Sequence, residues 1–284
     1  MTSPSLLRVG CLQMNSGPNV HDNLNFIRDS LERGPEIDLL VLPENFSQMP
    51  VNKSEIGAEP SGQNPGSDYV KEFLSQLASD QNLFIIAGSL PLLSSGSTKP
   101  MARCLIVSPQ GIIGHYDKIH LFDVDIQTER GSQRYCESDT YQKGSADSEN
   151  LKVHGLQIGE NDVRLGPSIC YDLRFPELYR QFASQEANII TVPAAFTYET
   201  GQAHWEFLLR ARAVENQAFV LAAAQVGDHA PKRSTWGHSM IVDPWGNVLA
   251  EKPESVGLLY ADLDLNQIKQ LQQRFPVLEH RRLF

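Results

Sequence analysis

Three residues with complementary side chains each follow a stretch of predicted strand. Glu44 comes two residues after the apolar run DLLVL, Lys118 follows GIIGHYD, and Cys170 lies between a predicted strand and a predicted helix in LGPSICYDLRFPEL. Loops at strand ends are where α/β proteins assemble their functional sites. This placement makes the three residues candidates for one site.

A thiol, a carboxylate and an ammonium together could hydrolyse an amide through a thioester. The thiol is the nucleophile, the carboxylate takes its proton and returns it to the leaving amine, and the ammonium stabilises the oxyanion. A cysteine before a helix also lies near free backbone amides and the positive end of the helix dipole, which favour the thiolate. Each residue alone has a structural alternative, as a buried thiol, a solvated carboxylate or a surface lysine.

The elements that must position these residues are helices and short strands that alternate along the chain. Because they interleave throughout, we expect an α/β layered sandwich with helices outside. Residues 122–150 are polar and rich in turn formers, and we expect a long surface excursion there. Strands are predicted at 6–14, 38–42, 83–90, 102–107, 111–116, 163–169, 188–192, 218–225 and 257–262 and on both sides of the turn 243–247, and helices at 22–32, 69–78, 176–183, 203–215 and 265–273.

Composition excludes several classes of protein. The 284 residues carry a formal charge of −10, which argues against a general nucleic-acid binder. No apolar run approaches the roughly 20 residues of a membrane helix, and we expect no membrane partner. The four cysteines form no CxxC motif, so we expect reduced thiols and, without a signal peptide, a cytoplasmic protein. No metal or nucleotide signature is present, and we expect no metal and no cofactor.

Longer motifs give the chain a family resemblance. The segments PEN (43–45), YDKIHLFDVDI (116–126), ICYDLRFPEL (169–178) and HWEFLLRARAVENQAFV (204–220) resemble the nitrilase superfamily of carbon–nitrogen hydrolases. PAAFTYETGQAHW and STWGHSMIVDPWGN are similar to its Nit branch. The resemblance covers essentially the whole chain and implies a single carbon–nitrogen hydrolase domain over 1–284. The implied fold is an α-β-β-α sandwich, two packed sheets with helices outside.

The resemblance also implies roles for four residues. Glu44 would be the general base, Cys170 the nucleophile and Lys118 the group that stabilises the tetrahedral intermediate. The second, positioning glutamate of the family would be Glu137 in the tripeptide CES. The chain departs from the family after DVDI, where QTERG replaces the usual Pro-Gly, and this moves a loop beside the expected site.

Three further residues are candidates for substrate binding. Arg174 follows Cys170 by four residues, and its guanidinium could hold a carboxylate through two hydrogen bonds. By resemblance, Phe196 would form a wall and Thr200 would act as a donor for a 2-oxo acid. The structural alternative for Arg174 is an internal salt bridge with Glu177 or Asp172.

Histidine offers a rival way to activate the cysteine. His204 opens a predicted helix, and His238 is a second candidate for a Cys–His pair. With eight histidines in the chain, one near any cysteine is expected by chance. We therefore favour the glutamate as the base.

The function implied by the resemblance is amide hydrolysis on a small-molecule 2-oxo acid amide. We expect deaminated glutathione to give 2-oxoglutarate and cysteinylglycine, with 2-oxoglutaramate as the alternative substrate. A true nitrilase fits the motifs less well, and a catalytically retired binding protein would have lost one of the three catalytic positions. The resemblance also implies a homodimer in which helices after Cys170 and around 204–216 pack against the partner. The segment 276–284 either crosses to the partner or forms a surface tail.

Overall fold

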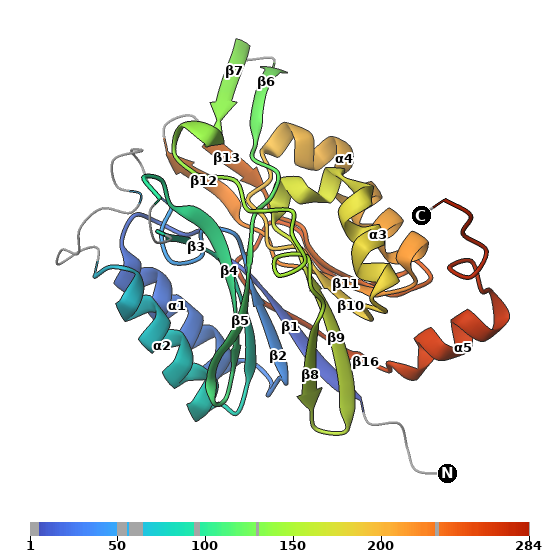
Figure 1. The fold of residues 1–284 in the computed structure, drawn as a ribbon. Coiled ribbons are helices and arrows are strands. Elements are labelled where there is room, and N and C mark those ends of the chain that lie inside the picture. The colour runs from blue at the N-terminus through green and yellow to red at the C-terminus, as the bar shows by residue number, and fades with distance from the viewer. Residues whose placement is uncertain are drawn as a thin grey trace.

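Two six-stranded sheets pack face to face at the centre of the molecule, with helices on both outer faces (Figure 1). The computed structural model describes residues 6–49, 56, 65–93, 97–128, 131–230 and 233–283. The expected α-β-β-α sandwich is therefore confirmed. Among the described helices, none is long and apolar enough to cross a membrane.

The first sheet has the order β16-β1-β2-β3-β4-β5. Its three central strands are parallel and its outer pairings are antiparallel. Since β5 runs in the same direction as β2 and β3, the carboxyl ends of β2 and β5 lie at the same edge of the sheet. The strands are β1 (Leu7–Gln13), β2 (Leu39–Leu42), β3 (Phe84–Leu92), β4 (Met101–Ser108), β5 (Gly111–Asp117) and β16 (Gly257–Leu263).

The second sheet repeats this plan in the order β15-β14-β11-β10-β9-β8. Strands β9, β10 and β11 are parallel, and the outer pairings are antiparallel. Two small hairpins, β6-β7 and β12-β13, stand outside the sheets. The strands of this sheet are β8 (His154–Ile158), β9 (Asn161–Pro167), β10 (Ile189–Thr191), β11 (Phe219–Ala222), β14 (Ser239–Val242) and β15 (Val248–Lys252). The hairpin strands are β6 (Asp123–Thr128), β7 (Gly131–Cys136), β12 (Val226–Ala230) and β13 (Arg233–Trp236).

The helices cover the outer faces of the sheets because their apolar residues recur at helical spacing. Helices α1 (Val20–Arg33) and α2 (Ser67–Asp80) lie on the first sheet, and α3 (Pro176–Ser184) and α4 (Tyr198–Asn216) on the second (Figure 1). Helix α5 (Asn266–Arg274) follows β16. Two short 3₁₀ helices, η2 (Glu137–Asp139) and η3 (Cys170–Arg174), follow β7 and β9.

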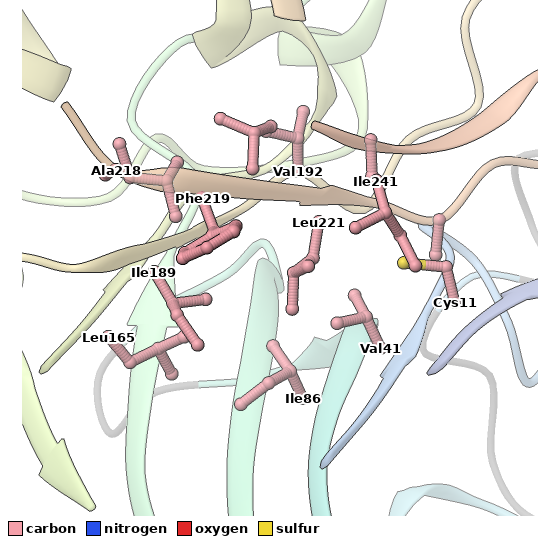
Figure 2. Close-up of a cluster of buried hydrophobic side chains, with 14 of the residues drawn as sticks. Cys11, Val41, Ile86, Leu165, Ile189, Val192, Ala218, Phe219, Leu221 and Ile241 are labelled. Carbon is pink, nitrogen blue, oxygen red and sulfur yellow. The ribbon is translucent and has the colours of Figure 1, made fainter. Parts of the chain in front are cut away.

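The core between the sheets consists of aliphatic and aromatic side chains from both inner faces. Figure 2 shows Cys11, Val41 and Ile86 from the first sheet opposite side chains of the second, including Leu165 and Leu221. All five are 0% exposed. This dry contact fixes the two sheets relative to each other, so it also fixes the loops at their edges.

Two expectations from the sequence need correction. Part of the excursion at 122–150 is ordered as the β6-β7 hairpin and η2. Strand β8 and the β12-β13 hairpin were not predicted, because short strands with polar residues carry little periodic signal. The other predicted elements are present, with boundaries shifted by up to five residues.

Gly88 gives the Glu44 loop room to pass over β3. Its φ is +29°, and a Cβ built there would lie 1.8 Å from the backbone oxygen of Pro43. The same strand has a register shift between Ala87 and Leu90. A side chain at Gly88 would therefore push away the segment that carries Glu44.

We predict that Gly88→Ala lowers both stability and activity. The clash and the unfavourable φ should reduce the free energy of unfolding by more than about 1 kcal/mol, which corresponds to roughly 2–4 °C or more in melting temperature. Thermal denaturation and amide hydrolysis would measure the two effects. Gly155→Ala is the matched control, because a Cβ there meets nothing within 4 Å. Equal behaviour of the two variants would contradict this account of Gly88.

Candidate active site

A buried lysine held by two glutamates lies at the centre of the candidate site. Lys118 follows β5 and is 1% exposed. Its Nζ lies 2.8 Å from Oε1 of Glu44, and 2.9 and 2.8 Å from the two carboxylate oxygens of Glu137. Burial alone would lower the pKa of this lysine, but the charges of Glu137 and Glu44 outweigh it and raise the pKa well above its ordinary value. The ammonium is therefore permanently charged.

Glu44 is fixed at both ends. Its Oε1 faces Lys118, while its Oε2 accepts a hydrogen bond from the backbone N–H of Ala195 at 2.9 Å. The side chain of Gln225 donates to the Glu44 backbone oxygen at 3.0 Å. Burial would raise the pKa of the Glu44 carboxyl, but the Lys118 ammonium outweighs burial and the pKa is lowered. Glu44 is therefore an ionised, oriented carboxylate.

Cys170 sits at a strained turn between β9 and α3. Its φ is +49°, a left-handed conformation that is uncommon for residues other than glycine. The backbone N–H of Cys170 donates to the Pro193 oxygen at 2.8 Å, which holds the turn against the end of β10. The thiol lies close enough to the Glu44 carboxylate for that group to raise its pKa. Strained backbone of this kind is typical of functional sites.

The expectation that Cys170 favours the thiolate is wrong. Burial and the charge of Glu44 raise the pKa of the thiol well above its ordinary value, against the opposing effects of Lys118 and the Ala195 N–H. The residue begins a 3₁₀ helix of five residues rather than a long α-helix, so little helix dipole acts on it. The resting pair is a neutral thiol beside an ionised carboxylate, as a general base requires.

The fully buried Asp172 ties the segment that carries the cysteine to the segment that carries the lysine. It accepts hydrogen bonds from the Ile169 backbone N–H and the Tyr116 hydroxyl, both at 2.9 Å. It also accepts one from the His120 backbone N–H at 3.1 Å and contacts Nδ1 of His120 at 2.7 Å. These contacts hold the ends of β5 and β9 together, because each would leave a buried polar group unpaired if it were lost.

Glu137 reaches the site from the segment where the chain departs from its family pattern. It begins η2 directly after the β6-β7 hairpin. Its carboxylate accepts a hydrogen bond from the Phe122 backbone N–H at 2.7 Å and contacts Lys118. Residues 129 and 130 of the departing segment lie outside the described residues. The altered loop thus still delivers Glu137 to the lysine.

All seven candidate residues line one cavity of about 640 Å³. Arg174 lies over the Phe196 ring at 5.2 Å and over the Tyr171 ring at 5.8 Å, and its Nη1 is 3.3 Å from Nδ1 of His204. Cation–π contacts hold the guanidinium in place without neutralising it. Thr200 also reaches the cavity, but its hydroxyl is engaged with that of Thr197 at 2.8 Å.

The structural alternatives for these residues find no support among the described residues. Arg174 forms no ion pair there, and Asp172 is occupied by other groups. His204 contacts Arg174, and His238 stacks on Trp236 at 4.2 Å and contacts Glu251. Neither histidine lines the cavity. In the described part of the chain, no group of three histidine, cysteine or acidic side chains could hold a metal ion.

Tyr141 and Arg233 are among the cavity residues that the sequence did not single out. Tyr141 lies close to the charged groups, and burial and the charges of Glu137 and Glu44 raise the pKa of its hydroxyl. Arg233 extends from the β12-β13 hairpin, which was not predicted. No local motif marks either residue, so only the packing of distant segments could have revealed them.

Comparison with known proteins defines the class of this protein. The family described as carbon–nitrogen hydrolase matches residues 8–273. The chain therefore belongs to the carbon–nitrogen hydrolase family, within the nitrilase superfamily, and is a hydrolase that acts on carbon–nitrogen bonds of amides.

Particular relatives give a finer comparison. The chain is 42% identical over 277 residues to a deaminated glutathione amidase of Yersinia enterocolitica, covering 96% of this chain and 92% of that one. It is 36% identical over 289 residues to a deaminated glutathione amidase of Homo sapiens, covering 99% of this chain and 84% of that one.

Solved structures support the same fold. The NitFhit protein of C. elegans superposes with a TM-score of 0.85 at 36% identity, covering 99% of this chain and 66% of that protein. Saccharomyces cerevisiae Nit3, a member of branch 10 of the nitrilase superfamily, superposes with a TM-score of 0.79 at 29% identity, covering 99% of this chain and 100% of that one.

The pKa shifts predict a broad pH plateau of activity. Because the pKa of Glu44 lies below its ordinary 4.5 and that of Cys170 lies well above its ordinary 9.0, the carboxylate–thiol pair persists between these limits. We expect kcat/KM to be flat across neutral pH, with an acid limb that includes protonation of Glu137, whose pKa burial raises above its ordinary 4.5. A site with a histidine base would instead show an inflection near pH 6.5. A pH–rate profile with such an inflection would contradict the assignment of Glu44.

Proposed function

We propose that this protein hydrolyses deaminated glutathione to 2-oxoglutarate and cysteinylglycine through a thioester on Cys170. The observation that carries the proposal is that Cys170, Glu44 and Lys118 line one cavity, with the lysine Nζ 2.8 Å from the glutamate Oε1. The relatives described as deaminated glutathione amidases support the choice of substrate. The proposal treats 1–284 as one catalytic domain.

The first half of the reaction forms the thioester. Glu44 takes the thiol proton as the Cys170 sulfur attacks the amide carbonyl carbon, and Lys118 stabilises the oxyanion that develops. When the tetrahedral intermediate collapses, the carbon–nitrogen bond breaks and the protonated Glu44 gives its proton to the leaving amine. The acyl group stays on the sulfur as a thioester.

The second half returns the enzyme to its resting state. Glu44 takes a proton from a water molecule, whose oxygen attacks the thioester carbon. The carbon–sulfur bond then breaks, the acid is released, and the proton on Glu44 returns to the sulfur of Cys170. Glu137 keeps Lys118 charged and aimed throughout, because it holds the ammonium by charge and by hydrogen bonds.

Arg174 is the group that we assign to the carboxylate of the 2-oxo acid. Its guanidinium has aromatic neighbours and no ion pair among the described residues, so its charge is available to an anion. Phe196 forms the wall beneath it, and Thr200 lines the same cavity and would contribute its hydroxyl. The cytoplasmic location expected from the sequence stays a prediction.

A parallel assay of wild type and Cys170→Ala tests substrate and nucleophile together. Both proteins would receive deaminated glutathione and 2-oxoglutaramate, with release of 2-oxoglutarate as the readout. We expect the wild type to prefer deaminated glutathione, and the variant to lose at least about 10⁴-fold in kcat because the nucleophile is gone. Cys136→Ser is the matched control, since Cys136 lines the cavity but contacts Ser138 and Asp139.

Each outcome of this assay separates substrate from mechanism. A preference for 2-oxoglutaramate would move the assignment to an ω-amidase and leave the thioester mechanism in place. Full activity of Cys170→Ala would exclude Cys170 as the nucleophile. A wild type inactive on both substrates would exclude the proposed substrate class.

The proposed assembly is a homodimer formed through α4. An apolar surface on α4 and the neighbouring β14–β15 turn exposes Phe207, Val214 and Trp245, at 74%, 45% and 62%. Large aromatic side chains exposed together are typical of protein interfaces. Phe207 and Val214 lie in the segment around 204–216, which the family resemblance implies faces the partner.

We predict that Phe207→Glu shifts the protein from dimer to monomer. A charge in the middle of an apolar interface has no partner and must be desolvated, which weakens association by at least about tenfold. Sedimentation velocity over a range of concentrations would measure the shift. Ile113→Glu is the control, because Ile113 is an exposed apolar residue on β5 in the other sheet. A wild type that sediments as a monomer, or a variant that stays dimeric, would contradict the assignment.

A further inference from the structure

Among the described residues, the buried Nε of one cavity arginine has no hydrogen-bond partner. Arg233, on β13, lines the cavity beside the catalytic residues but forms neither an ion pair nor a side-chain hydrogen bond with any described residue. Its Nε is buried and unpaired. A buried donor without a partner is unfavourable by about 1–3 kcal/mol, and more when it is charged. The site therefore presents a guanidinium that a bound anion would satisfy.

Other cavity cations do not share this combination of features. Lys118 is matched by two glutamates, and Arg174 lies between aromatic rings and beside His204. Arg134 also lines the cavity, but its side chain is exposed. Arg233 is the partly buried cation for which the proposed mechanism has no use.

Arg233 enters the cavity from a different element than Arg174, and it lies near Glu44. Strand β13 runs beside the segment that follows Ala195, through the Thr197–Thr235 bridge and a hydrogen bond from the Trp236 N–H to the Phe196 oxygen. Arg233 is also near enough to Glu44 to help lower the pKa of that carboxyl. Because Glu44 returns the proton to the leaving amine, a cation near Glu44 is within reach of the leaving group.

The proposed substrate has a carboxylate at each end. One belongs to the 2-oxo acid, on the acyl side, and the other ends the cysteinylglycine leaving group. Two extended residues span at most about 7 Å from the amine nitrogen to the terminal carboxylate, and a cavity of about 640 Å³ is within the usual size range of small-molecule sites. With Arg174 assigned to the first carboxylate, the second one lacks a partner.

We propose that Arg233 binds the terminal carboxylate of the peptide leaving group and thereby selects peptide amides over the primary amide 2-oxoglutaramate. The inference rests on the proposed function and deepens it. Arg233 is a specificity residue that acts on the half of the substrate that 2-oxoglutaramate lacks. A guanidinium suits this role because it can hold a carboxylate through two parallel hydrogen bonds.

The test compares Arg233→Gln with wild type on three substrates. These are deaminated glutathione, the same molecule with its terminal carboxylate replaced by a carboxamide, and 2-oxoglutaramate. A charge-assisted hydrogen-bonded pair contributes to the free energy of substrate binding. Its loss should therefore lower kcat/KM for deaminated glutathione by about 10- to 100-fold, mainly through a higher KM. Activity on 2-oxoglutaramate should change less than about threefold, and this also shows that the variant is folded.

The carboxamide substrate closes a double-mutant cycle. Replacing the terminal carboxylate by a carboxamide should lower kcat/KM of the wild type about as much as Arg233→Gln lowers kcat/KM for deaminated glutathione. The variant should lose little further kcat/KM when it is given the carboxamide. Arg233→Lys, which keeps the charge but not the two-pronged hydrogen bonding, should fall between wild type and Arg233→Gln. Independent, additive losses would overturn the inference.

Several outcomes distinguish this inference from its alternatives. An equal loss of kcat/KM on all three substrates, with a shifted acid limb of the pH profile, would indicate that Arg233 acts by lowering the pKa of Glu44. That result would overturn the leaving-group role. A selective loss in Arg134→Gln instead of Arg233→Gln would move the role to Arg134 and overturn the inference. A wild type active only on 2-oxoglutaramate would remove the proposed substrate itself, whereas a wild type active on the peptide with an unaffected Arg233→Gln would overturn only the inference.

Discussion

The burial of the Lys118 ammonium is the constraint on which the candidate site depends. Removing a charge from water is unfavourable by several kcal/mol, so a lysine that is 1% exposed needs close partners. Two glutamates supply them, and their combined charge exceeds that of the lysine. Burial, together with the charge of Glu44, raises the pKa of the neighbouring Cys170 thiol and keeps it protonated. One electrostatic arrangement thus sets the protonation state of every group at the centre of the site.

The site also depends on the contact between the two sheets. Glu44 and Lys118 follow strands of the first sheet, while Cys170 and Ala195 follow strands of the second. Hydrogen bonds cross between the sheets at this edge, from the Ala195 N–H to Glu44 and from Tyr116 to Asp172. The aliphatic core between the sheets is therefore the support that keeps base and nucleophile within reach (Figure 2).

Much of this arrangement could be predicted from the sequence. A residue that follows a strand stays at the edge of the sheet even when the predicted strand boundary is wrong by a few residues. The runs before Glu44 and Cys170 are apolar enough to identify buried strands, and their ends must meet at sheet edges. The protonation state of Cys170 could not be predicted, since it depends on burial and on a carboxylate 126 positions away in the chain. Arg233 was missed because the polar β12-β13 hairpin has no clear period, and its approach to the cavity is set by tertiary packing.

The division of the site between two sheets affects how the enzyme should respond to mild perturbation. A small slip of one sheet against the other would leave the hydrogen-bonding ladders within each sheet intact, yet it would separate Glu44 from Cys170. Since a displacement of about 1 Å can reduce a rate 10²-fold, catalysis is a more sensitive gauge of sheet alignment than secondary structure is. Inactivation by heat or denaturant should therefore begin before the strands unfold. Substitutions deep in the core can likewise abolish activity without unfolding the protein.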